Sequence, residues 1–260
     1  MTLTLATGPV LLDDEGESLR RRLAMRLVDS LHRPVAVVPT RTYAEVAAMI
    51  ARGDAQLAWL PPAIFVRAEA DPGVRVLAAV ERSRGAGYRG VLFAPAAAPI
   101  HELSDLEGSR VAWVDRDSCA GHLFPRLALR QRGLEPSELF GEEIFAGSHG
   151  SAVRAVMNGD ADVGATHAQT LDDGQTLMLA GWQPYAGNDG MRPLLVTDPI
   201  PSDVICAAAD LDDETRGAVR EALLSLHDAG EELLDELFGG PRLVPASSDD
   251  YEPVRAAMKK

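Results

Sequence analysis

The chain has 260 residues, enough for one large domain or two smaller ones. Hydrophobic residues make up 46% of it and charged residues 25%, as in ordinary globular proteins. The net charge of −14 argues against binding to nucleic acid, which needs a basic surface, and no apolar run is long enough to span a membrane.

Short β-rich runs alternate with longer helical runs, which indicates an α/β architecture. In the first part we expect strands at 2–6, 34–38, 55–60, 74–80 and 88–94, and helices at 17–31, 42–52 and 64–70. After a break at 95–99 the alternation resumes. There we expect strands at 110–114, 143–145, 162–166, 191–196 and 204–208, helices at 104–106, 121–132, 148–158 and 251–258, and one or two helices within 213–238.

This order predicts two lobes, each a mixed sheet flanked by helices, with a ligand cleft between them. Chain crossings near 88–95 and 192–201 would form the hinge, and closure of a hinge around a ligand is a common use of such a fold. Lobe 1 would consist of residues 1–91 and 199–260, and lobe 2 of residues 92–198.

The turn from Asp117 to His122 is the sharpest local feature, because a predicted strand runs there into small residues that open a helix. A helix N-terminus offers N–H groups without partners and the positive end of the helix dipole, which suits an anion. Ser118 adds a hydroxyl, and Gly121 lets a ligand approach the backbone. The alternative is that Asp117 or Ser118 serves only as an N-cap.

Three further residues are candidates for the same kind of site. His149 follows Gly147 and Ser148 at a second helix start and could bond to an anion. Tyr43 and Tyr88 could each offer a phenol to a cleft. Ordinary exposure or partial burial is the competing interpretation for all three.

No P-loop, GxSxG, HExxH or GxGxxG pattern occurs, and no cofactor is expected. The six histidines form no metal-type spacing with cysteine or carboxylate, so no metal is expected. An enzyme is the less favoured interpretation. Its catalytic residues would be Cys119, His122 and His149, gathered in one cleft with a thiol activated at a helix N-terminus.

The chain resembles the phosphonate, phosphite and phosphate substrate-binding proteins of ABC transporters, the PhnD-like group within the type 2 periplasmic-binding fold. The resemblance runs along nearly the whole chain and rests on the order and spacing of many motifs. These are Tyr43 with Gly53-Asp54, Leu60-Pro61-Pro62, Tyr88, Leu103 to Val114, Asp117 to Gly121, Gly147-Ser148-His149, Asn158 to Asp162, Ile200 to Asp203, and Asp250 to Arg255.

The resemblance implies that a small oxyanion-bearing ligand is held in the cleft between the lobes. The family's hydroxyl-rich turn corresponds to Ser118, Cys119 and Ala120, which lead to Gly121. A histidine and two tyrosines assist in the family, and they correspond to His149, Tyr43 and Tyr88. Asp203 is the acidic candidate for a ligand's amine.

Three departures from the family pattern bear on the ligand. Cys119 and Ala120 lack two of the family's hydroxyl donors, and each lost bond to a charged ligand is worth about 1.5–3 kcal/mol. A position that is acidic in relatives falls near Gln169. No export signal is visible at the N-terminus, so we expect a cytoplasmic protein if the chain is complete, or a periplasmic or extracellular one if it is a trimmed mature form.

The first hypothesis is therefore a solute-binding protein whose partners are a small anion and, if it is exported, an ABC permease. The alternatives are a cytoplasmic enzyme of a biosynthetic pathway on the same fold, and an intracellular sensor or partner-binding module. The ligand's identity and the oligomeric state are left open.

Overall fold

The computed structural model describes residues 2–9, 12–70, 73–81, 88–171, 173–229 and 231–259, and its chain divides into two compact units. Unit 1 comprises Met1–Ser83 and Ser202–Glu252, and unit 2 comprises Arg84–Pro201 and Pro253–Lys260. These units differ in extent from the expected lobes. The strand that begins at Tyr88 pairs along its length within unit 2, and the last residues pack on unit 2 as well. The lobe limits therefore stay a prediction, and each unit is described by itself.

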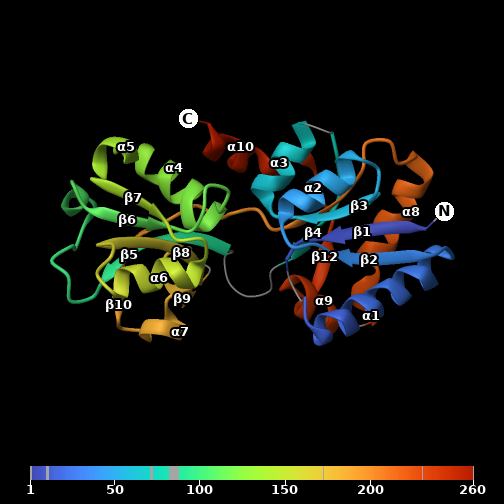
Figure 1. The fold of residues 1–260 in the computed structure, drawn as a ribbon, viewed down its shortest axis with the longest axis horizontal. Coiled ribbons are helices and arrows are strands. Elements are labelled where there is room, and N and C mark those ends of the chain that lie inside the picture. Colours follow the sequence, from blue (N-terminus) through green and yellow to red (C-terminus); the bar gives the residue numbers. More distant parts are fainter. Residues whose placement is uncertain are drawn as a thin grey trace. The chain divides into compact units, whose positions relative to one another are not determined.

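Unit 1 is built on a six-stranded sheet in the order β12-β4-β11-β3-β1-β2 (Figure 1). Strand β1 is parallel to both β2 and β3, whereas β11 runs antiparallel to its neighbours β3 and β4. The strands are β1 (Leu3–Thr7), β2 (Val35–Pro39), β3 (Leu57–Leu60), β4 (Arg75–Glu81), β11 (Val204–Ala207) and β12 (Arg242–Val244).

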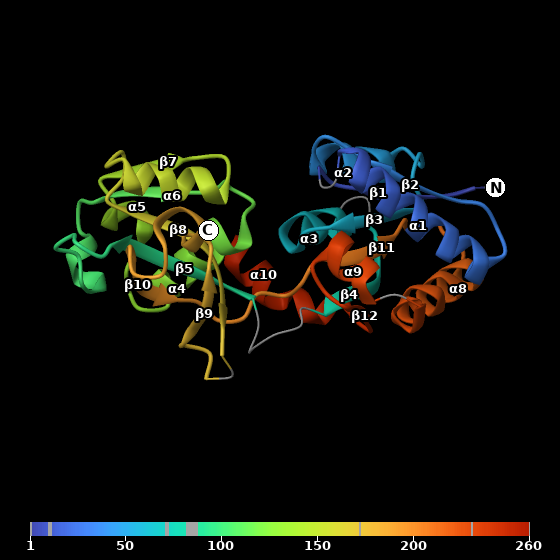
Figure 2. The ribbon, with the colours of Figure 1, turned by 90° about the horizontal axis from the view of Figure 1, so that it is seen from below.

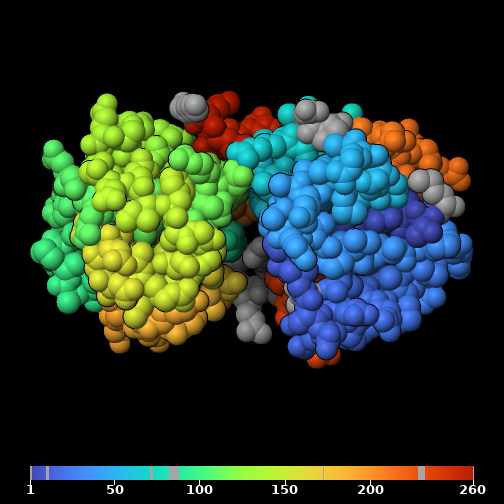
Figure 3. All heavy atoms as spheres, viewed as in Figure 1, coloured from blue at the N-terminus to red at the C-terminus, as the bar shows by residue number. Residues whose placement is uncertain are grey.

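The helices of unit 1 cover this sheet. They are α1 (Asp14–Leu31), α2 (Tyr43–Ala51), α3 (Pro62–Ala70), α8 (Asp213–Leu224) and α9 (Glu231–Phe238), with the short helical turns η3 (Leu226–Ala229) and η4 (Ser248–Tyr251). Helix α1 shows why the sequence folds this way. The Asp13 side chain caps it by accepting from the N–H of Gly16, and Leu19, Leu23 and Leu27 follow at a spacing of four on its buried face. The opposite, charged face of α1 lies on the surface of the unit (Figure 3, blue).

Unit 2 is built on a second sheet in the order β10-β5-β8-β6-β7, and β9 pairs with β8 beside this path (Figure 1; Figure 2 gives a second view). The strands are β5 (Tyr88–Pro95), β6 (Arg110–Trp113), β7 (Glu142–Phe145), β8 (Val163–Thr170), β9 (Leu177–Ala180) and β10 (Met191–Val196). The helical segments are η1 (Leu103–Leu106), η2 (Cys119–Leu123), α4 (Phe124–Arg130), α5 (Pro136–Leu139), α6 (His149–Met157) and α7 (Gln183–Ala186). Helix α10 (Glu252–Met258) begins at the last residue of unit 1 and continues into unit 2.

Two separate cores lie on the two faces of the unit 2 sheet. Alternate residues of each strand point to opposite faces, so Phe93 of β5 packs with α6, whereas Leu92 packs with α4. Helices α4 and α6 therefore cover opposite faces. Strand β6 is parallel to both β7 and β8, and the chain passes from β6 to β7 and then back to β8. This order places a topological switch point between β6 and β8, where open α/β sheets commonly bind ligands.

At the amino-terminal edge of this sheet, Asp162 fixes the start of β6. Its carboxylate accepts bonds from the backbone N–H and the guanidinium of Arg110, at 2.8 to 3.1 Å. The Arg110 guanidinium also donates to the carbonyls of Gly159 and Asp160. These bonds hold the pKa of Asp162 below its ordinary value. The motif at 158–162 is thus a structural clamp on the edge away from the switch point.

The predicted α/β class, with two mixed sheets flanked by helices, is confirmed. The expected strands and helices are present, with shifted ends: α1 begins at Asp14 rather than 17, and β8 runs on to Thr170 rather than ending at 166. The sequence did not predict the short elements α5, β9, α7, β12 and η4. Within the described ranges, no helix is long and apolar enough to cross a membrane.

Candidate ligand-binding site

The turn at Ser118 opens a helix, as expected. The helix begins at Cys119 rather than at Gly121, and its first turn is wider than an α-helical turn. The Ser118 side chain is the N-cap and its Oγ accepts from the N–H of Gly121 at 3.0 Å. The Ser118 carbonyl then accepts from the N–H of Leu123 at 3.0 Å, a bond across five residues that makes η2 a single π-helical turn. Such turns are rare and occur often at functional sites. The N–H of Ala120 lies in this first turn, where the helix itself supplies no acceptor.

Close packing of backbone on backbone holds this turn against the sheet. A Cβ atom on Gly90 of β5 would lie 2.6 Å from the carbonyl oxygen of Ala120. A Cβ atom on Gly121 would lie 2.2 Å from the Val114 side chain, and the Gly121 carbonyl accepts from the Val114 N–H. Glycine at these two positions therefore allows the turn to pack directly on β5 and on the end of β6.

A row of three rings lies at the same edge of unit 2. The ring of Tyr88, the first residue of β5, stacks on His167 of β8 with centroids 6.1 Å apart. His167 in turn meets His149, the first residue of α6, edge to face at 4.8 Å. Gln169, near the position that is acidic in relatives, lies directly opposite Tyr88 in the β5–β8 register. The sequence reading missed His167, because the antiparallel pairing of β5 with β8 is not visible in the local pattern.

His149 is held by Thr166, a fully buried residue of β8. The Nδ1 atom of His149 lies 3.0 Å from the Thr166 hydroxyl. If that hydroxyl donates to Nδ1, the remaining ring nitrogen carries its proton and can donate to an anion. Burial lowers the pKa of His149 below its ordinary value, so the ring is neutral at pH 7 and acts as a polar donor rather than as a cation.

A small cavity of about 230 Å³ adjoins this row. His149 and His167 form its polar wall, and Leu179, Pro184 and Tyr185 form its apolar wall. The cavity is large enough for a small organic group but has few hydrogen-bonding partners for a charged one.

All these residues share one edge of the unit 2 sheet. The Ser118 turn follows β6, His149 follows β7, and His167 lies in the second half of β8, and these three strands are parallel. Strand β5 is antiparallel to β8, so its first residue, Tyr88, lies at the same edge. This is the carboxyl edge, next to the switch point between β6 and β8. Of the predicted site residues of unit 2, Tyr88 and His149 are joined through His167, and the Ser118 turn packs on the neighbouring strand.

Unit 1 carries the other two predicted residues, Tyr43 and Asp203, at the carboxyl edge of its own parallel strands. Tyr43 begins α2 directly after β2, and its ring covers Gly8 at the end of β1. A Cβ on Gly8 would lie 2.1 Å from the Tyr43 ring. Asp203 precedes β11, which is antiparallel and so begins at this edge. Burial first, and then the charge of Asp203, raise the pKa of the neighbouring Tyr251.

The residues proposed for an enzyme are not brought together. His122 packs edge to face against Trp113 and Phe145 on the α4 face of the sheet, with its Nδ1 at 3.1 Å from the carbonyl oxygen of Arg116. His149 begins α6, on the opposite face. The two histidines of the expected cluster of Cys119, His122 and His149 thus belong to opposite faces, because the crossovers of this sheet alternate between its faces. Both cysteines, Cys119 and Cys206, are buried free thiols, and no metal-binding group of three or more ligands occurs among the described residues.

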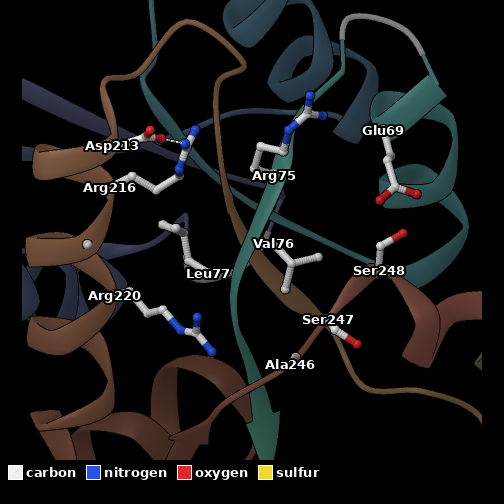
Figure 4. A pocket seen from close by; sticks show the side chains of 11 residues that line it. Glu69, Arg75, Val76, Leu77, Asp213, Arg216, Arg220, Ala246, Ser247 and Ser248 are labelled. Atoms are coloured by element: carbon white, nitrogen blue, oxygen red, sulfur yellow. Dashed lines mark ion pairs between the residues drawn. The ribbon is translucent and has the colours of Figure 1, made fainter.

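Unit 1 contains a different pocket, shown in Figure 4, at the amino-terminal edge of its sheet. Its arginines are partly compensated: Arg216 pairs with Asp213, and Arg75 donates to the carbonyl of Gly73 at 2.8 Å. Arg220 projects into the pocket from α8. Because Tyr43 and Asp203 lie at the opposite edge, this pocket takes no part in the site described above.

Comparison with known proteins identifies the family. The family model described as "ABC transporter, phosphonate, periplasmic substrate-binding protein" matches residues 6–251. The chain belongs to this family. The phosphate-import protein PhnD of Mycolicibacterium smegmatis is 31% identical over 225 residues, which cover 75% of this chain and 68% of that protein.

Solved structures of other proteins share the fold of the chain. PhnD1 from Prochlorococcus marinus in complex with methylphosphonate superposes with a TM-score of 0.73 at 20% identity, covering 98% of this chain and 96% of that one. A Xanthomonas citri protein bound to ATP gives a TM-score of 0.78 at 17% identity, covering 99% and 95%. The predicted resemblance and the predicted solute-binding function are thereby confirmed. The family is one of periplasmic proteins that serve ABC transporters.

Proposed function

We propose that the chain binds a small tetrahedral oxyanion of the phosphonate or phosphate class and delivers it to an ABC permease. The observation that supports the proposal is that the Ser118 helix start and the contacting rings of Tyr88, His167 and His149 lie at the same carboxyl edge, beside a topological switch point. Family membership supports the transport role and the permease partner.

In this proposal the Ser118 hydroxyl and the backbone of residues 119–121 bind the ligand's oxygens. Ser118 Oγ already accepts the Gly121 N–H, so its own proton is available to donate to the ligand. His149 donates a hydrogen bond from its ring. The ring of His167 lies between those of His149 and Tyr88 and contacts both. Tyr43 and Asp203, at the carboxyl edge of the unit 1 sheet, remain the predicted ligand residues of that unit, and Asp203 is the acidic candidate for a ligand's amine.

The side chains favour a ligand with three oxygens and one apolar substituent. Cys119 and Ala120 stand where hydroxyl donors occur in the family, so a fourth oxygen would lack a partner that relatives provide. The cavity beside His149 and His167 offers apolar wall to a small alkyl group. We therefore expect methylphosphonate and phosphite to bind more tightly than phosphate.

The test is a calorimetric titration of the full chain with methylphosphonate, phosphite, phosphate, 2-aminoethylphosphonate and sulfate. The expected result is saturable binding of the first two, weaker binding of phosphate and least binding of sulfate. Absence of heat and of thermal stabilisation with every phosphorus oxyanion at millimolar concentration would refute the proposal. Equal binding of sulfate would refute the selectivity argument.

A further inference from the structure

A second cavity, of about 550 Å³, lies wholly within unit 2 on the α4 face of its sheet. Helix α4, the edge strand β7, the loop before Ser118 and the chain end at 257–259 line it. The residues that matter for its chemistry are Arg116, His122, Arg126, Arg130, Phe145 and Lys259. None of them is among the residues to which the proposed function assigns ligand contacts.

The cavity is cationic in a protein of net charge −14. Four basic side chains line it, against the carboxylates of Glu135 and Glu143. Glu143 is already satisfied, because it accepts from Arg126 at 2.5 Å and from the Trp113 indole at 2.6 Å. The charges of Arg126 and Glu143 thus cancel. Three basic side chains, Arg116, Arg130 and Lys259, then face one remaining carboxylate, that of Glu135.

Among the described residues, two of these cations are held in place and pair with no carboxylate. The Arg116 guanidinium lies over the Phe145 ring, 4.4 Å from its centroid, and this contact fixes its plane and leaves its N–H groups to other acceptors. Arg130 donates to main-chain carbonyls, those of Ala257 at 3.4 Å and Lys259 at 3.3 Å. Positioned guanidinium groups that lack a carboxylate partner are the usual means of binding a phosphate group.

His122 adds a hydrogen-bond acceptor to this cationic wall. Its Nδ1 faces the carbonyl of Arg116, which can only accept, so Nδ1 carries the proton and the other ring nitrogen is an acceptor. Burial, the largest cause, lowers the pKa of His122, so the ring is neutral at pH 7. An acceptor among cations suits a ligand that has a hydroxyl or amino group as well as its negative charge.

We infer that this cavity is a second anion site, for a phosphate monoester with an organic part of nucleotide size. The dianionic phosphate would bind to Arg116, Arg130 and Lys259. The hydroxyl or amino groups would bond to His122, and the volume lies in the range that organic ligands occupy. An inorganic oxyanion would fill only a fraction of it.

The test is a titration of the full chain at low ionic strength with AMP as the probe, beside ribose 5-phosphate, inorganic phosphate and adenosine. We expect saturable binding of AMP and weaker binding of inorganic phosphate and of adenosine. The Arg130→Ala variant should weaken AMP binding at least tenfold and leave methylphosphonate binding unchanged. Arg130→Gln, which keeps a polar side chain but removes the charge, should have the same effect, and circular dichroism checks that both variants fold.

Two control variants make the result decisive. Arg220→Ala removes an arginine from the pocket of unit 1 and should leave AMP affinity unchanged, whereas an equal loss would show that only net charge matters and would overturn the inference. The second control, Ser118→Ala, should weaken the binding of methylphosphonate but not the binding of AMP. Loss of AMP binding in Ser118→Ala, or competition between AMP and methylphosphonate, would place AMP at the first site and overturn the inference. So would equal binding of adenosine, or no AMP binding at millimolar concentration. Since the two ligands are measured separately, failure of one proposal leaves the other standing.

Discussion

Replacing Ser118 by alanine separates the two roles of this residue, that of helix cap and that of ligand donor. In the free protein the change removes the bond from the Gly121 N–H to Oγ, and loss of such a cap costs about 0.5–2 kcal/mol. For a chain of this size, a loss of about 1 kcal/mol corresponds to a fall in Tm of roughly 2–4 °C. With methylphosphonate bound, the change also removes a hydrogen bond to a charged group, worth about 1.5–3 kcal/mol.

The expected loss of affinity is therefore about 10- to 150-fold, measured by calorimetry on a protein that remains folded. Asp212→Ala is the matched control, because Asp212 caps α8 by accepting from the Thr215 N–H at 2.7 Å, at the edge of unit 1 away from Tyr43. It should lower Tm with no change in affinity. Ser118→Thr should restore binding. If Ser118→Ala lowers Tm like the control and binds methylphosphonate with unchanged affinity, Ser118 is only a cap and the proposed site is wrong.

Three further predictions follow from the same geometry. Ala120→Ser and Cys119→Ser each return a hydroxyl to the turn, and either should tighten phosphate binding more than methylphosphonate binding; calorimetry showing equal gains would contradict the proposed orientation. Gly90→Ala brings a Cβ within 2.6 Å of the Ala120 carbonyl and should cost about 1–3 kcal/mol in urea unfolding as well as weakening ligand binding. The pKa of His149, lowered by burial, should rise when an oxyanion binds, and proton NMR of its ring with and without methylphosphonate measures this. As pH falls, His149 is protonated at a higher pH in the unfolded chain than in the folded protein, because burial lowers its pKa in the folded state. The free energy of unfolding should therefore fall as pH drops below about 6.5, and the fall should be shallower in His149→Gln.

The local features of this fold are visible in the sequence because they depend on neighbours along the chain. The leucines of α1 repeat at helical spacing, and Gly53 adopts the positive φ of 76° that ends α2 as expected. The same reasoning found the Ser118 turn, since a cap and a small-residue helix start are both local signals. It did not predict the π-helical turn, in which the Ala120 carbonyl packs against Gly90 of a strand distant in sequence.

The partners of the site residues depend on pairings between distant segments. The ring of Tyr88 stacks on that of His167 because β5 pairs antiparallel with β8. The residue pattern of neither strand predicts this pairing or its register. His122 belongs to the Ser118 turn, and His149 begins a second helix start later in the sequence. The helices that follow the two turns cover opposite faces of the sheet, and this separation depends on topology, which the local sequence pattern does not reveal.

The position of β11 in unit 1 has a consequence for how the chain folds during synthesis. This strand lies between β3 and β4, yet it leaves the ribosome only after the main segment of unit 2, residues 84–201, is complete. Unit 2 can therefore form its sheet while unit 1 still lacks a central strand and exposes the open edges of β3 and β4. Exposed strand edges invite misassembly, so unit 1 is the part of the nascent chain with the greater need for a chaperone. Pulse proteolysis of released chains truncated near residue 201 would show a protected unit 2 beside a cleavable unit 1.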